Sequence, residues 1–315
     1  MSEFKEQETE TFEYTTQGFP PKPIMKERGG NAVMRSLLSL FIYALLFYFL
    51  FNDVTYIAAI LIVIIIHELG HFLFMRLYNY SNVKIFIFPL LGAFTSGKKQ
   101  NVSQMQLATI ILAGPVPGVI IGSILFYLNL EWKDETVKML STTFLYINLL
   151  NFLPFYPLDG GRFLETLFFK QNHLLRLVFG IISIMALSFL FFYSPIMLIV
   201  PIMVGLELYN ETKHQKIRDY LVNEKINYRT DYPNLPDKDY WLIRDCLILS
   251  FPKKYPGIPA GNYQYHMAEP VLVQHVNAVL QVNLKNDLSI FQKISLIIFY
   301  ILIFIAPLVF LIRNI

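Results

Sequence analysis

The sequence has few charged residues and almost no cysteine. Only 16% of its 315 residues are Asp, Glu, Lys or Arg, whereas 55% are hydrophobic. This balance excludes an ordinary soluble domain, in which about 25% of the residues are charged. Cys246 is the single cysteine, so no intrachain disulfide can form, and a lone thiol suits a reducing compartment.

Other absences narrow the reading further. The first 17 residues are polar and acidic, and they lack the basic and apolar regions of a cleaved signal peptide. The polar stretch 210–290 contains no internal repeat and no glycine-rich phosphate loop. The net charge of +3 is small and identifies no partner, and we expect no nucleic-acid partner.

Long apolar runs dominate what is present. About 20 apolar residues suffice for a helix to cross the roughly 30 Å hydrocarbon core of a bilayer. We therefore predict an all-α polytopic membrane protein with about 6–7 transmembrane helices. The expected spans are residues 37–51, 55–75, 106–128, 139–153, 174–193, 195–208 and 294–311.

One apolar segment, Val83–Thr95, is too short to cross comfortably as a helix, and Pro89 and Gly92 interrupt it. We expect a re-entrant loop or a small β-hairpin, covered by protein or lining a water-filled cavity. A helix lying flat at the interface is the alternative. The segment Ala113–Gly118, AGPVPG, should break or kink the span 106–128 and let another backbone come close.

Composition divides the chain into four parts. Residues 1–35 are predicted to be a flexible cytoplasmic tail, and residues 36–209 a membrane domain. Residues 210–290 are rich in charge and proline and form a cytoplasmic region of unknown role. Residues 291–315 contain the last transmembrane helix.

The basic residues indicate an orientation. With a cytoplasmic N-terminus and about seven spans, Lys133, Lys138 and Arg313 lie outside, and the other 23 of the 26 basic residues lie inside. His67 is then about nine residues from the inner end of its span, roughly 13 Å deep.

The sequence HELGH lies within the span 55–75. His67 and His71 are four residues apart, so on a helix both imidazoles share one face and can bind a single divalent metal. Glu68 lies beside them and can reach a metal-bound water. Ionisable groups at membrane depth are costly and indicate function. The alternative is a set of buried polar residues that bond neighbouring helices.

Two histidines leave a catalytic zinc site incomplete, because such a site uses three protein ligands and an open position. Asp159 is the carboxylate candidate, since it follows a span and is flanked by Pro157 and Gly160–Gly161. A helix N-cap is its alternative role. The remaining histidines fall in loops or in the polar region and are most simply exposed: His173, His214, His266 and His275.

The two motifs together resemble a known family. HELGH on one span, followed by N-x-x-P-x-x-P-L-D-G-G at Asn151–Gly161, is similar to the site-2 protease family of intramembrane zinc metalloproteases. The resemblance covers about residues 54–167 and implies a three-helix metalloprotease core. One departure is Gly118, which stands where many relatives have the asparagine of A-G-P-x-x-N.

The resemblance also implies roles for individual residues. His67, His71 and Asp159 would bind Zn²⁺, and Glu68 would be the general base. Asn151 would position the substrate backbone or its developing oxyanion.

The implied activity is hydrolysis of peptide bonds in or near transmembrane segments of membrane-anchored proteins, as in regulated intramembrane proteolysis. The expected partners are membrane-spanning protein substrates and the lipid bilayer. The expected location is the bacterial cytoplasmic membrane, with the active site toward the cytoplasm. Segment Val83–Thr95 would be a membrane hairpin whose edge pairs with an unwound substrate.

Two rival readings stay open at this point. Another class of membrane metallopeptidase, prenyl-protein or HtpX-like, takes a downstream glutamate as third ligand, and Glu207 is the only later acid at the end of a span. A non-catalytic metal-binding receptor or a metal carrier that retains the fold is the second.

Overall fold

The computed structural model describes residues 18–25, scattered positions between 34 and 49, and then 52–88, 92–169, 172–189, 198–281 and 283–314. The chain divides into two compact units. One joins Met1–Gly29 to Tyr209–Asn283, and we call it the polar unit. The other joins Gly30–Leu208 to Leu284–Ile315, and we call it the membrane unit.

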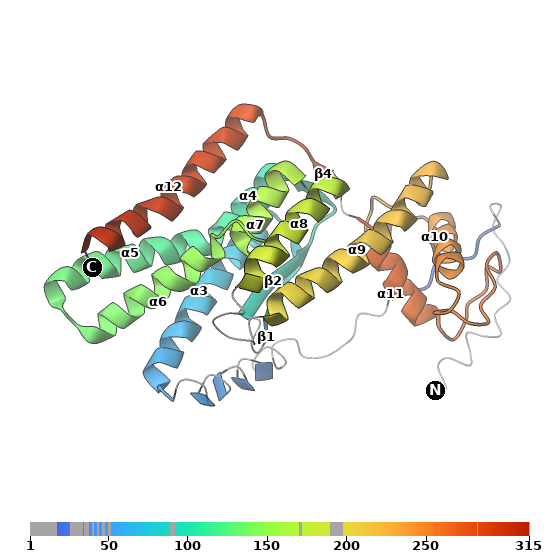
Figure 1. Cartoon of the computed structure of the whole chain (residues 1–315). Helices are drawn as coiled ribbons and strands as arrows, with labels where there is room; N and C mark the ends of the chain where they lie inside the picture. The colour runs from blue at the N-terminus through green and yellow to red at the C-terminus, as the bar shows by residue number, and fades with distance from the viewer. Residues whose placement is uncertain are drawn as a thin grey trace. The chain divides into compact units, whose positions relative to one another are not determined.

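The described part of the membrane unit is mostly helical (Figure 1). Its helices are α3 (Val54–Leu77), α4 (Gln104–Ala113), α5 (Pro115–Trp132), α6 (Glu135–Asn151), α7 (Asp159–Leu164), the π-helical turn η2 (Glu165–Phe169), α8 (His173–Ser188), the start of α9 (Ile199–Asn223) and α12 (Ile290–Asn314).

Three stretches of described helix are long and apolar enough to cross a membrane. They are Val54–Leu77, Gln104–Trp132 and Ile290–Arg313. The second combines α4 and α5, which meet at Gly114, as expected from the glycine and prolines of AGPVPG. The all-α membrane fold is confirmed. The count of about 6–7 spans stays a prediction, and most of the span 37–51 lies outside the described residues.

The short apolar segment forms a β-hairpin, so the alternative of a flat interfacial helix is wrong. Strands β1 (Ser81–Phe88) and β2 (Gly92–Lys98) pair antiparallel, with Phe86 opposite Phe94 and their ring centroids 5.3 Å apart. Both strands pack against α3. Farther along the chain, β3 (Asn101–Ser103) pairs with β4 (Asn283–Lys285).

The membrane unit has a core formed mainly by α4, α5, α6 and α7. α5 and α6 run side by side (Figure 1). The final helix contributes as well, because the ring of Tyr300 stacks on Phe163 with centroids 5.1 Å apart, and its hydroxyl donates to the carbonyl of Phe152. α12 therefore supports the turn that precedes Asp159.

The polar unit has its own core, which surrounds α10 (Asp237–Ser250) and α11 (Glu269–Val279). Within it Arg244 and Glu269 are both buried and form an ion pair, with Nε and Oε1 3.0 Å apart. A short 3-10 turn, η5 (Tyr232–Asn234), lies between α9 and α10.

The division predicted between residues 209 and 210 lies one residue from the point where the two units divide, between Leu208 and Tyr209. α9 is one continuous helix from Ile199 to Asn223 across this division. Residues 18–25 pack on the polar unit, whereas a flexible tail was expected over residues 1–35. Three prolines and an aromatic residue give this segment stiffness and apolar surface, which the overall polarity of the tail conceals.

Candidate metal centre

α3 presents His67 and His71 on one buried face. The two side chains are one helical turn apart, their ring centroids lie 4.9 Å apart, and their Nε2 atoms are separated by 3.2 Å. Both residues are less than 9% exposed. The spacing in HELGH therefore has the predicted geometric consequence.

Asp159 joins these histidines from the first turn of α7. Its Oδ2 lies 3.0 Å from Nε2 of His67 and 3.3 Å from Nε2 of His71. Among the described residues, these three are the one group of His, Cys, Asp or Glu side chains arranged to hold a metal ion, with ligand atoms within 4.8 Å of one another. Asp159 begins α7 while Leu158 is its N-cap, so the alternative role as N-cap is wrong.

Hydrogen bonds on the far side of each ring determine which nitrogen faces the centre. Nδ1 of His71 lies 2.8 Å from the carbonyl of Ile110, which only accepts, so this nitrogen donates. Nδ1 of His67 lies 2.9 Å from Oδ1 of Asn148. Both Nε2 atoms consequently direct lone pairs toward the carboxylate of Asp159. Three acceptors that converge without a donor fit a divalent cation.

Asn148 was not anticipated as part of this centre. It is fully buried, and its Nδ2 donates to the carbonyl of Phe144 at 2.8 Å, which leaves Oδ1 to accept from His67. Its only signal in the sequence was an amide inside an apolar helix, three residues before Asn151.

A glycine makes room for the metal-binding side of His71. A Cβ atom at Gly114 would lie 2.2 Å from Nε2 of His71, and one at Gly70 would lie 1.9 Å from the carbonyl oxygen of Ala113. The close backbone approach expected from AGPVPG is therefore observed, and it keeps the space beside Nε2 open.

Glu68 lies next to the centre without belonging to it. The residue is 4% exposed, and its Oε2 accepts a hydrogen bond of 2.7 Å from the hydroxyl of Thr95 on β2. The hairpin thus reaches the candidate general base. Thr95 was not singled out from the sequence, because an isolated threonine in a strand has no distinctive pattern.

Comparison with known proteins is consistent with this geometry. Residues 55–143 match the family model described as Peptidase family M50. The match covers less than a third of the chain. The matched range includes HELGH, the hairpin and AGPVPG. Asp159 lies beyond it, and the fold brings Asp159 to the two histidines.

Two individual proteins are similar to parts of this chain. A zinc metalloprotease of Methanocaldococcus jannaschii is 26% identical over 185 residues, which are 56% of this chain and 51% of that protein. Stage IV sporulation protein FB of Bacillus subtilis is 28% identical over 114 residues, which are 36% of this chain and 40% of that protein. The chain thus spans about half or less of these relatives.

Among solved structures, the site-2 protease from Methanocaldococcus jannaschii aligns with 22% identity and a TM-score of 0.43. The alignment covers 56% of this chain and 88% of that one.

The other candidate residues lie outside the cluster of ligand atoms. Asn151 is partly buried, and its Nδ2 donates to the carbonyl of Ile147, so its role toward substrate stays a prediction. Glu207, the rival third ligand, accepts from the hydroxyl of Tyr156 at 2.5 Å. Of the four remaining histidines only His266 is exposed, whereas exposure was expected for all of them.

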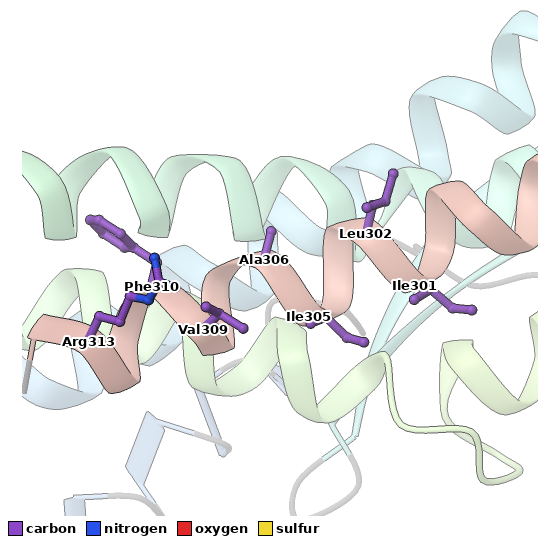
Figure 2. Close-up of a pocket in the computed structure, with 7 residues that line it drawn as sticks. All are labelled: Ile301, Leu302, Ile305, Ala306, Val309, Phe310 and Arg313. Carbon is purple, nitrogen blue, oxygen red and sulfur yellow. The ribbon is translucent and has the colours of Figure 1, made fainter.

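α12 also carries a surface hollow whose lining includes none of the residues of the metal centre. Seven residues of α12, from Ile301 to Arg313, line this hollow (Figure 2). All but Arg313 are apolar, as expected for a helix surface in contact with lipid.

Proposed function

We propose that this chain is an intramembrane zinc endopeptidase that hydrolyses peptide bonds in or near transmembrane segments of membrane-anchored proteins. The convergence of His67, His71 and Asp159, with Glu68 beside them, is the observation that supports this proposal most. A metal carrier or receptor has no need of a buried carboxylate next to its ligands, whereas a hydrolase needs a base.

His67, His71 and Asp159 would hold the Zn²⁺ and leave a position for water, as in other catalytic zinc sites with three protein ligands. Bound zinc supplies Lewis acidity, which polarises a peptide carbonyl and acidifies water. Glu68 accepts the proton of the attacking water and returns it to the leaving amine. Thr95 holds one carboxylate oxygen of Glu68 and so restricts its rotamer.

Substrate binding involves the hairpin in this proposal. A transmembrane helix pairs all its backbone amides internally, so the segment to be cut must unwind before attack. A two-stranded sheet leaves one edge of each strand without a partner strand, and an unwound segment can add to such an edge. We infer that preferred substrates contain helix-breaking residues near the cleavage site, and that Asn151 contacts their backbone.

The location follows from the same proposal. The apolar helices and the match to peptidase family M50 support an integral membrane protein. The strong asymmetry of the basic residues supports a cytoplasmic orientation of the active site, and we propose the bacterial cytoplasmic membrane as its location.

Replacing the base separates catalysis from metal binding. For Glu68→Gln purified in detergent, we expect unchanged zinc content by mass spectrometry. Cleavage of a single-span substrate with a helix break should fall at least about 100-fold. Glu131→Gln makes the same chemical change at an exposed position and should cleave normally. Normal cleavage by Glu68→Gln would contradict the proposal and favour a metal-binding protein without this chemistry.

A further inference from the structure

A proline-rich segment of the chain lies extended on the polar unit. Residues 18–25 read GFPPKPIM and form no helix or strand. Proline fixes its own φ near −65° and restricts the preceding residue, so Phe19–Pro23 is held close to the polyproline II conformation. Exposure repeats with a period of three: Pro20 is buried and Pro23 partly buried, whereas Pro21 and Ile24 are exposed. This is the repeat of a polyproline II helix.

The backbone of this segment is bound by aromatic side chains. Each of the three proline carbonyls accepts a hydrogen bond from a side chain of the polar unit. The pairs are Trp241 Nε1 to Pro20 at 2.7 Å, the Tyr265 hydroxyl to Pro21 at 2.7 Å and the Tyr232 hydroxyl to Pro23 at 2.6 Å. A proline has no N–H, so each proline of the segment presents only its carbonyl acceptor and its ring surface.

The basic residue between the prolines is also recognised. The backbone N–H of Lys22 donates to Oδ1 of Asp237 at 2.9 Å. Its Nζ donates to the carbonyl of Pro233 at 2.9 Å and to that of Leu235, and it lies 5.7 Å from the ring centre of Tyr232. These carbonyls favour a cation at this position over an apolar side chain.

The aromatic donors are themselves in contact with buried and charged side chains of the polar unit. Trp241 is fully buried, and the guanidinium of Arg244, itself paired with Glu269, lies 4.9 Å from its ring centre. Burial, with the nearby Glu269 carboxylate, raises the pKa of Tyr232, so its hydroxyl remains a donor at neutral pH. Trp241 is therefore held by contacts with the rest of the polar unit as well as by the segment that it binds.

We propose that the polar unit is a recognition site for extended proline-rich segments with a basic residue between the prolines, and that its resident ligand is this chain's own Phe19–Pro23. Polyproline II segments generally dock in grooves lined by aromatic side chains. Here aromatic side chains donate to the proline carbonyls, and the Lys22 side chain adds contacts of its own. The ligand comes from more than 200 residues away in sequence. A partner with the same chemistry would enter by displacing it.

The test uses the full chain in detergent and a labelled synthetic peptide, GFPPKPIM. Pro20→Ala/Pro23→Ala weakens the internal ligand and should bind the peptide at least about tenfold more tightly than the wild type, measured by fluorescence anisotropy. The wild type resists because a tethered ligand acts at an effective concentration up to about millimolar. Ile24→Ala, which alters a side chain that is 91% exposed, should behave as the wild type does.

One further variant identifies the binding surface. Adding Tyr265→Phe to the double variant removes a single donor and should weaken peptide binding about two- to tenfold. A double variant with an unchanged melting temperature and no gain in peptide affinity would overturn the proposal, and so would an unaltered affinity with Tyr265→Phe.

Hydrogen exchange of the wild type decides the matter should the double variant fail to fold. Excess peptide should accelerate exchange at the Lys22 amide, which is bound to Asp237. An unchanged exchange rate at millimolar peptide would show that the segment is permanent packing.

Discussion

The contact between Gly118 and Asn148 predicts that a methyl group at one position disturbs the metal centre through the other. A Cβ atom at Gly118 would lie 2.1 Å from Nδ2 of Asn148 and 2.3 Å from its Cγ. Asn148 is fully buried and held on both sides, by Phe144 and by His67. Gly118→Ala must therefore displace the amide and deprive His67 Nδ1 of its acceptor.

The size of the effect follows from what His67 loses. Loss of a hydrogen-bond partner behind a metal ligand typically lowers metal affinity about 10–100-fold, or about 1.4–2.7 kcal/mol. Asn148→Ala should have this effect directly, and Gly118→Ala should have it through displacement. In the double variant, the shortened side chain at position 148 no longer occupies the space that the new methyl requires. The loss of zinc-binding free energy in the double variant should then be smaller than the sum of the two single losses by about 1 kcal/mol or more.

The assay is a zinc competition titration against a chelator, with melting temperatures measured in parallel. Gly205→Ala is the matched control, because Gly205 is also a helical glycine of the membrane unit. A Cβ atom at Gly205 would have no neighbouring atom closer than 3.9 Å. Strictly additive effects would refute the argument, since they would show that Gly118 and Asn148 act independently. Wild-type zinc affinity in Asn148→Ala would refute the role of the amide itself.

Three further outcomes follow from the described contacts. Asp159→Ala should lower zinc occupancy below that of wild type by elemental analysis, since it removes one of three ligand atoms. Gly114→Ala should also lose zinc, because its Cβ would lie 2.2 Å from His71 Nε2, while Gly205→Ala keeps it. Burial, with Lys254 and His214 nearby, lowers the pKa of His275. The unfolded chain therefore binds more protons, and the stability of the polar unit should fall as pH drops below about 6.5. His275→Gln should reduce this dependence in melting curves recorded between about pH 5 and 8.

The residues that were predictable share a local pattern with a single geometric consequence. His67 and His71 at a separation of four residues must share a helix face, and the proline–glycine break around Asp159 permits a carboxylate to turn inward. Likewise, Val83–Thr95 was too short for a membrane helix, so a re-entrant loop or a small β-hairpin was expected, and the hairpin is observed. In each case the chain has few alternatives at the level of local structure.

Asn148 and the segment at residues 18–25 were not predictable for a different reason. The importance of Asn148 depends on where α3 and α5 pass α6, and no spacing in the sequence records a crossing between helices. The proline-rich segment appeared to belong to a polar tail, because composition averages over a window and conceals a few stiff residues. The donors for its carbonyls lie on Tyr232, Trp241 and Tyr265, far along the chain.

The departure at Gly118 now has a physical explanation. Gly118 stands where many relatives of the site-2 protease family have an asparagine, which put a polar contact in doubt. In this chain the space beside Gly118 holds the amide of Asn148, and even one additional carbon at position 118 would overlap it. An asparagine at 118 and Asn148 in its present position are mutually exclusive. The glycine at position 118 thus leaves the space in which Asn148 of α6 orients His67.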